Sequence, residues 1–138
     1  MLQSTHDIIT THPHPTNMFH AEDLAACVDA CMVCSSTCTS CADACLAEDN
    51  VQQFIRCIRL NLDCADICNA TRTVMLRRTI RDETVLRAQL EACIAACQVC
   101  GKECEMHARM NMSHCDVCAQ ACRHCEQACR QLLNSFRA

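Results

Sequence analysis

The sequence predicts an all-α protein: an antiparallel, up-down-up-down four-helix bundle with a cysteine-lined core and a short N-terminal lead-in. Three observations predict this fold. The 138 residues include one glycine and two prolines, Pro13 and Pro15, so nothing after Pro15 forces a helix to break. The 18 cysteines recur mostly at steps of three and four residues, which is the spacing of a buried helix seam. Short polar turns separate four such seams, and short connections favour antiparallel neighbours.

The N-terminal lead-in, residues 1–16, is expected to be a polar segment outside the bundle domain of residues 17–138. Ser4 can cap one helical turn that runs through Thr10, and the two prolines then end it. The histidines of this segment could bind a metal, but a solvated tail is the simpler interpretation because chain termini are commonly loosely held. These histidines are His6, His12 and His14.

The first long helix is expected to begin at Thr16 or Asn17 and to end near Glu48. Six of its cysteines follow steps of four, three, four, three and four residues, so thiols occupy the seam positions that Leu or Ile normally fills. Extending the seam backward adds Leu24 and His20. The seam cysteines are Cys27, Cys31, Cys34, Cys38, Cys41 and Cys45.

Three further helices are predicted over residues 51–77, 83–109 and 114–135, with Asn50, Asp82 and Ser113 as the expected N-caps. Gly101 lies inside the third predicted helix, where glycine costs about 1 kcal/mol relative to alanine. The seam of the second helix is Phe54, Cys57, Asn61, Cys64, Cys68, Thr71 and Met75. The seam of the third is Leu86, Leu90, Cys93, Cys97, Cys100, Cys104 and His107. The seam of the fourth is Cys115, Cys118, Cys122, Cys125, Cys129, Leu132 and Phe136.

The antiparallel topology predicts that the two ends of the bundle differ. One end collects apolar seam residues into a plug, made of Leu24, Met75, Leu86, Leu90, Leu132 and Phe136. The other end collects thiols and imidazoles, namely Cys41, Cys45, Cys57, Cys104, His107, His114, Cys115 and Cys118. Met106, Met110 and Met112 lie in or beside the adjoining turn, where they could either contact a metal or simply pack. A soft metal ion is therefore expected to enter at the second end.

The net charge and the composition of the N-terminal segment limit which binding partners and which cellular compartment are expected. The net charge of −4 and the lack of a basic stripe with aromatic platforms argue against nucleic acid as a partner. The first 17 residues show no basic segment followed by an apolar one, and no apolar run reaches the roughly 20 residues of a membrane span. The expectation is a cytoplasmic protein without membrane contact, in a reducing compartment that keeps thiols free.

The number and placement of the cysteines point to metal binding. One or two buried cysteines would behave as small hydrophobes, but 18 of them placed mainly on core seams indicate thiol chemistry. A disulfide framework needs specific cross-helix geometry and an oxidising compartment. Iron–sulfur clusters are typical of looped cysteine runs with a nearby proline, and no cysteine here has one.

Zinc and Cu(I) are the two metals that thiols on these seams favour. Tetrahedral Zn²⁺ takes four thiolates and leaves two surplus negative charges at each site, which are costly to bury along a narrow axis. Soft, monovalent Cu(I) favours thiolate, accepts two or three sulfurs and can share a bridging thiolate. About one Cu(I) per cysteine would cancel the charge, so a continuous thiol tube suits many Cu(I) ions better than a few Zn²⁺ ions.

With these motifs in place, the chain resembles the bacterial copper storage proteins, specifically the cytosolic type without an export signal. The resemblance covers nearly all of residues 20–130. It rests on the seam of residues 27–45, on the stretch of residues 57–68, and on the cysteine-rich halves around the His107 and His114 turn. It implies a four-helix bundle that holds many Cu(I) ions and assembles as a homotetramer. By position, Asn61 matches the family's seam asparagine, and His107 and His114 match its mouth histidines.

The resulting hypothesis is storage of Cu(I), loaded from the His107 and His114 end, without catalysis. A zinc buffer and a thiol redox protein are the alternatives; the latter needs one or two privileged cysteines, which uniform seams do not offer. Asn61 could equally be a satisfied polar core residue, and His124 is expected to face solvent. The candidate metal ligands are Cys27, Cys31, Cys34, Cys38, Cys41, Cys45, Cys57, Asn61, Cys64, Cys68, Cys93, Cys97, Cys100, Cys104, His107, His114, Cys115, Cys118, Cys122, Cys125 and Cys129.

Overall fold

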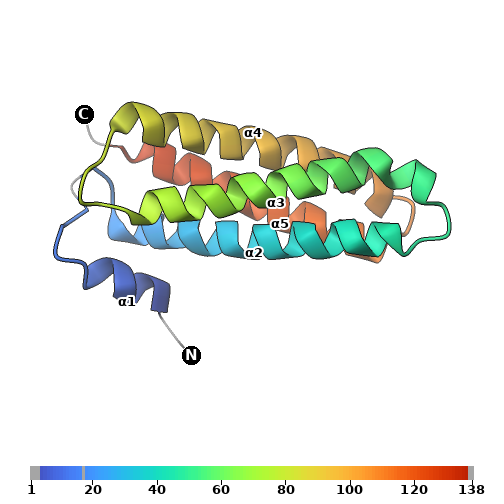
Figure 1. Cartoon of the computed structure of the whole chain (residues 1–138), viewed down its shortest axis with the longest axis horizontal. Helices are drawn as coiled ribbons and strands as arrows, with labels where there is room; N and C mark the ends of the chain where they lie inside the picture. The colour runs from blue at the N-terminus through green and yellow to red at the C-terminus, as the bar shows by residue number, and fades with distance from the viewer. Residues whose placement is uncertain (1–3, 17, 137–138) are drawn as a thin grey trace.

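A computed structural model describes residues 4–16 and 18–136, and over these residues it confirms the predicted bundle (Figure 1). The long helices are α2 (Ala21–Leu46), α3 (Ile55–Leu76), α4 (Glu83–Ala108) and α5 (Ser113–Asn134). The short helix α1 (Ser4–Thr10) lies against α2, and a 3-10 turn, η1 (Val51–Phe54), precedes α3. The described residues contain no strand. Every predicted seam residue from Leu24 to Leu132 is buried, so the three-and-four spacing predicted the core correctly.

The predicted start of the first long helix is wrong. Helix α2 begins at Ala21, not at Thr16, and Asn17 lies outside the described residues. His20 is exposed and extended, with φ of −75° and ψ of 142°, so it precedes the helix rather than belonging to its seam. The reason is Phe19, whose side chain is fully buried. The chain must turn inward at Phe19 before the helix can start.

Of the three predicted N-caps, the structure confirms Asp82, places Asn50 at the N-cap of the 3-10 turn η1, and moves the third cap from Ser113 to Met112. The Asp82 carboxylate accepts a hydrogen bond from the Val85 backbone N–H at 3.2 Å, which confirms Asp82 as the N-cap of α4. Asn50 precedes the 3-10 turn η1 without a side-chain capping bond. Ser113 is the first residue of α5 and Met112 is the N-cap. The preceding turn sets this register, because Asn111 has a left-handed φ of 67°, a conformation that asparagine tolerates better than most residues.

The closed end of the bundle contains the predicted apolar plug and one aromatic residue that the sequence did not reveal. Leu24, Met75, Leu90 and Leu132 are fully buried there. Phe19 joins them, with its ring centroid 5.2 Å from that of the half-buried Phe136. The guanidinium groups of Arg81 and Arg87 lie over these two rings, at 4.5 and 4.7 Å from the centroids. These contacts seal the plug end with cation–π pairs.

Helix α1 docks on the bundle, so the interpretation of the lead-in as a solvated tail is wrong for this part. Ile9 is 97% buried in the common core cluster, and burying such a side chain is worth about 1.5–3 kcal/mol. The Thr5 hydroxyl donates a hydrogen bond to the Asp29 carboxylate of α2, and the Arg78 guanidinium donates to the Ile9 carbonyl oxygen. Amphipathic burial and these polar contacts hold the segment in place.

Helix α2 is long and apolar enough, by length and composition, to cross a membrane. Its cysteines contribute to this apolar character although they lie on the core seam. Half of the apolar window is buried inside the bundle, as is typical of the core helix of a soluble protein. The expected lack of an uninterrupted apolar run of about 20 residues concerns a different criterion, since α2 passes this one with charged residues inside the helix.

Gly101 lies where α4 passes close to Cys122 and Arg123 of α5. A Cβ added at Gly101 would lie 3.2 Å from Cys122 Cβ and 3.6 Å from the Arg123 guanidinium carbon. The missing side chain therefore permits a close approach of the two helices beside the thiols of Cys100 and Cys122. This explains a glycine in a helix interior despite its unfavourable propensity.

Candidate metal centre

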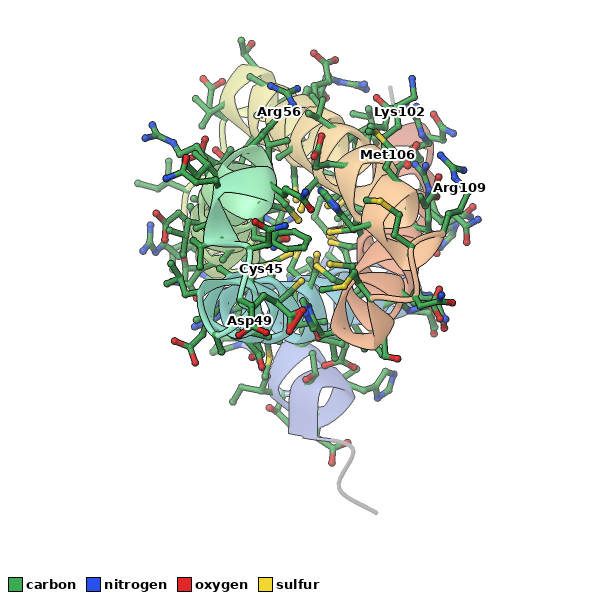
Figure 2. The ribbon with its side chains drawn as sticks, turned by 90° about the vertical axis from the view of Figure 1, so that its right-hand side faces the viewer. Cys45, Asp49, Arg56, Lys102, Met106 and Arg109 are labelled. Carbon is green, nitrogen blue, oxygen red and sulfur yellow. The ribbon has the colours of Figure 1, made fainter. Side chains whose placement is uncertain are left out.

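The core of the bundle is a row of free thiols that runs along most of its length. All 18 cysteines are free and buried, and none is more than 2% exposed. Figure 2 looks along the bundle from the end that carries Cys45 and shows the sulfur atoms gathered between the helices. The described cysteines therefore form no disulfides, and the thiols are shielded from solvent.

Thiols from different helices contact one another throughout the row. Near the plug, Cys27 Sγ lies 3.7 Å from Cys129 Sγ, which is 3.7 Å from Cys93 Sγ. At mid-length, Cys38 Sγ lies 3.7 Å from Cys122 Sγ and 3.6 Å from Cys118 Sγ. These contacts join α2, α4 and α5, and Cys64 and Cys68 of α3 lie 3.9 and 3.8 Å from Cys97 of α4. All four helices thus contribute sulfur to one continuous lining.

The sulfurs form groups of four that could each hold a metal ion, and the groups overlap. Cys125 belongs to the first and second group, Cys34 to the second and third, and Cys38 and Cys122 to the third and fourth. Within each group every sulfur lies within 4.8 Å of the others. Four of these groups are Cys31, Cys93, Cys125 and Cys129; Cys34, Cys68, Cys97 and Cys125; Cys34, Cys38, Cys64 and Cys122; and Cys38, Cys100, Cys118 and Cys122. Shared members mean that adjacent ions would need bridging thiolates.

The end of the bundle that carries His107 and His114, opposite the plug, is called the open end below. Asn61 is a hydrogen-bonding centre inside the row of thiols, near this open end. Its side chain is fully buried, and its Oδ1 accepts hydrogen bonds from Cys100, Cys118 and Cys104 at 3.0, 3.2 and 3.5 Å. Its Nδ2 donates to Cys57 Sγ at 3.6 Å. The asparagine is therefore a satisfied polar core residue in the metal-free state, and its Oδ1 faces three thiols that could bring an ion to it.

His114 joins the thiols at the open end. Its Nδ1 lies 3.5 Å from both Cys41 Sγ and Cys115 Sγ, and these atoms form a fifth group with Cys45. The His114 Nε2 is buried without a hydrogen-bond partner. A group of three sulfurs and one imidazole nitrogen is typical of soft-metal coordination. A surface groove lined by Ser36, Thr37, Ser40, Cys41, His114 and Val117 adjoins this group.

His107 lies on the α4 seam at the same end and is 4% exposed. Its Nε2 lies 3.0 Å from a Glu103 carboxylate oxygen, and its ring centroid is 5.0 Å from that of Phe54. The His107 Nδ1 is buried without a hydrogen-bond partner. A buried, unpaired ring nitrogen one helical turn from Cys104 is available to a metal ion.

The three methionines in or beside the turn at the open end differ in their exposure to solvent. Met106 and Met110 are 48% and 55% exposed, whereas Met112 is partly buried against the core cluster. In Figure 2, Met106 lies on the outer part of this end of the bundle. His124 is exposed, as predicted.

The thiols are electrostatically coupled. Burial raises the pKa of Cys45 to about 11. Deeper in the row, hydrogen bonds with neighbouring thiols, Cys125 first among them, lower the pKa of Cys93. The contact with Cys125 raises the pKa of Cys97. Such coupling arises because one thiolate is stabilised by adjacent S–H donors, which must then keep their protons.

The fold and the site together define a class of protein: a helical bundle whose free, buried thiols form a tube that can hold several soft metal ions. Residues 20–134 match the sequence model of the family described as copper storage protein. Because this match spans most of the sequence, the chain belongs to the copper storage protein family.

Solved structures and a curated relative agree with this assignment. The copper storage protein Ccsp from Streptomyces lividans, loaded with 10 copper equivalents, has a TM-score of 0.94 and 46% identity, over 96% of this chain and 100% of that one. A structure of copper loading, with five coppers, to a cytosolic copper storage protein from the same organism has a TM-score of 0.82 and 50% identity, over 84% and 96%. The uncharacterized cysteine-rich protein YhjQ of Bacillus subtilis is 34% identical over 90 residues, which are 65% of this chain and 77% of YhjQ.

The structure buries all 18 cysteines and Asn61 in the core and places His114 beside Cys41 and Cys115. His107 lies at the same end, but its side-chain contacts are with Glu103 and Phe54. Glu103 is a residue that the sequence prediction did not single out. Glu103 is 12% exposed in its side chain and contacts both His107 and Arg56. The sequence carried a signal for the first contact, because Glu103 precedes His107 by one helical turn. The second contact joins α3 and α4, and no local spacing reveals it.

Proposed function

We propose that this protein stores Cu(I), with about one ion per cysteine bound through the thiolates of the core. The observation that carries the proposal is the unbroken row of free thiols contributed by all four helices. Soft monovalent copper suits such a lining, because each Cu(I) ion cancels the charge of one thiolate. A filled tube would then be close to neutral, and burial of its contents would carry little electrostatic cost.

The overlap of the four-sulfur groups supports copper over zinc. Tetrahedral Zn²⁺ needs four thiolates of its own, but Cys34, Cys38, Cys122 and Cys125 each belong to two groups. Filling adjacent groups with zinc would require shared ligands and would leave surplus negative charge inside the bundle. Cu(I) accepts two or three sulfurs, so overlapping groups are an advantage for it.

Copper is proposed to enter at the end that holds His107 and His114. The opposite end is closed by fully buried Leu24, Leu90 and Leu132 and by the contacting rings of Phe19 and Phe136. The open end instead has a ring nitrogen of His114 at 3.5 Å from two thiols and an unpaired ring nitrogen on His107. Imidazoles there would pass an ion from solvent to the first thiols.

Storage without catalysis, in the cytosol, is the proposed role. The thiols form a continuous row in which many contact several neighbours, and an enzyme or redox sensor would need one or two distinguished cysteines. The relative from Streptomyces lividans is described as cytosolic, which supports the same compartment for this chain. The proposed ligands are the 18 cysteines together with His107, His114 and Asn61.

Assembly as a homotetramer is also part of the proposal. Apolar side chains remain exposed on all four long helices: Met32 and Val33 on α2, Leu62 on α3, Val99 on α4 and Val117 on α5. An apolar groove between α3 and α4 is lined by Leu60, Ile67, Ala92, Ala96, Val99 and their neighbours. Exposed apolar surface of this kind is typical of association surfaces. Sedimentation equilibrium of the reduced protein tests this, and a monomer at all concentrations would exclude the tetramer.

Anaerobic titration of the reduced protein tests the function itself. We expect Cu(I) uptake to continue to about one ion per cysteine, with the metal resistant to displacement by Zn²⁺. The metal-to-protein ratio, measured after removal of unbound metal, gives the capacity. Eighteen cysteines allow only about four separate sites of four thiolates each. Saturation near this number, with Zn²⁺ displacing copper, would contradict storage of Cu(I) and favour a zinc buffer.

A further inference from the structure

We propose that Glu103, held by Arg56, is a positioning residue that keeps the proton of His107 on Nε2 and leaves Nδ1 free to bind Cu(I). This inference rests on the proposed function, because it explains how the imidazole at the open end is prepared for copper. Neither Glu103 nor Arg56 is expected to touch the metal. Their effect acts through the orientation and tautomer of one ring.

The contacts of Glu103 divide its two oxygens between two donors. One oxygen lies 3.0 Å from His107 Nε2, and the other accepts a hydrogen bond from Arg56 Nε at 3.2 Å. The Glu103 side chain is 12% exposed and that of Arg56 is 70% exposed. The arginine can therefore reach in from the surface, neutralise a largely buried carboxylate and fix the plane of that carboxylate.

An ionised carboxylate only accepts hydrogen bonds, so the nitrogen that faces it must carry the proton. In a neutral imidazole the other nitrogen then has the lone pair. For His107 this other nitrogen is Nδ1, which is buried and has no hydrogen-bond partner. An orphaned buried acceptor costs about 1–3 kcal/mol, so a histidine with a purely structural role would be expected to satisfy it. The unpaired lone pair is the feature that a metal ion would use.

Packing from α3 completes the arrangement. The ring centroid of Phe54 lies 5.0 Å from that of His107, and Phe54 is 5% exposed. Phe54 ends η1, and Arg56 lies in the first turn of α3, whereas Glu103 and His107 lie one turn apart at the end of α4. The contacts among Arg56, Glu103 and His107 thus join α3 and α4 beside the open end. Figure 2 shows Arg56 on this face of the molecule. A ring held on both sides has little freedom to flip.

A carboxylate that accepts a hydrogen bond from a metal-binding histidine fixes its tautomer and raises its basicity. Removing such a partner commonly lowers metal affinity or activity by about 10–100-fold. We therefore expect Glu103→Ala to slow Cu(I) loading by about 10-fold and to leave the total capacity unchanged. Arg56→Met should have a smaller effect in the same direction, because the carboxylate keeps its contact with His107.

The first experiment needs no copper. Long-range proton–nitrogen NMR on the reduced, metal-free protein distinguishes the two tautomers of His107. The native protein is expected to show the Nε2–H form, and Glu103→Ala to show a substantial fraction of the Nδ1–H form. Glu105→Gln is the matched control, because Glu105 is two residues away and pairs with Arg123 instead. A native His107 with its proton on Nδ1 would overturn the proposal.

The second experiment measures stopped-flow loading from a Cu(I) chelate in the same variants. Slower loading by Glu103→Ala with native capacity supports positioning, whereas native loading rates despite a changed tautomer would overturn it. Should Glu103→Ala unfold, Glu103→Gln preserves the side-chain volume, and its amide can donate to Nε2 and so permit the Nδ1–H form. Failure of the native protein to bind more than a few Cu(I) ions would instead refute the proposed storage function, and the NMR result would stand apart from it.

Discussion

Replacing both histidines at the open end should separate the rate of copper loading from the capacity for copper. In the double variant His107→Ala/His114→Ala the core keeps all 18 thiols, none of which is more than 2% exposed. Two imidazoles are a small share of the available donors, so the capacity should fall by no more than about a tenth, since thiolates are the ligands that Cu(I) prefers.

The loading rate should change much more. His114 Nδ1 lies 3.5 Å from the Sγ atoms of both Cys41 and Cys115 at the open end. Without the imidazoles, an ion must reach thiols that are buried. We expect a decrease in rate of about 10–100-fold, the range seen when the surroundings of a metal site are altered.

Anaerobic stopped-flow absorbance with a chelated Cu(I) donor measures the rate, and equilibrium titration measures the capacity. His124→Ala is the matched control, because His124 lies on α5 but is exposed and outside the thiol groups. A large loss of capacity with an unchanged rate would refute the assignment of this end as the place of loading. So would equal slowing by His124→Ala.

Three more predictions concern the metal-free protein, and urea unfolding under reducing conditions measures each of them. Leu90→Ala, in the plug, should lower the free energy of unfolding by about 2–5 kcal/mol because it leaves a cavity, and the copper capacity should be unchanged; a change below 1 kcal/mol would argue that the plug can collapse around the gap. Gly101→Ala should lower the free energy of unfolding by about 0–2 kcal/mol, because the added Cβ would lie 3.2 Å from Cys122 Cβ and this crowding outweighs the gain in helix propensity. A clear increase in the free energy of unfolding would contradict the close approach of α4 and α5. Burial raises the pKa of Cys45 from 9.0 to about 11, so the folded state binds more protons than the unfolded state between these pH values. The contribution of Cys45 to stability should therefore be constant below pH 9 and fall by up to about 1.4 kcal/mol per pH unit towards pH 11. Comparison with Cys45→Ser isolates this contribution: the variant should lose less stability between pH 9 and 11, and an identical loss in the variant would contradict the assignment.

The heptad spacing predicted most of the fold and the buried row of thiols. Steps of three and four residues from Cys27 to Cys45 determine which face of α2 is buried, since side chains at this spacing lie on one face of a helix. The same reasoning placed Asn61 and His107 on their seams, and short turns decided the antiparallel order. The prediction failed at Thr16 and Ser113, where burial of Phe19 and the left-handed Asn111 determine the helix starts.

The sequence by itself determined that thiols line the core, because the helical period is a local property of the chain. Only the tertiary structure decided which thiols share a group, such as Cys34 with Cys64 and Cys122, and that Arg56 meets Glu103. It also decided that Ile9 docks α1 on the bundle. These contacts depend on how far each helix is shifted along its neighbour and rotated about its own axis. Side-chain packing between helices, including the close approach at Gly101, sets both quantities, and spacing along one helix contains no information on either.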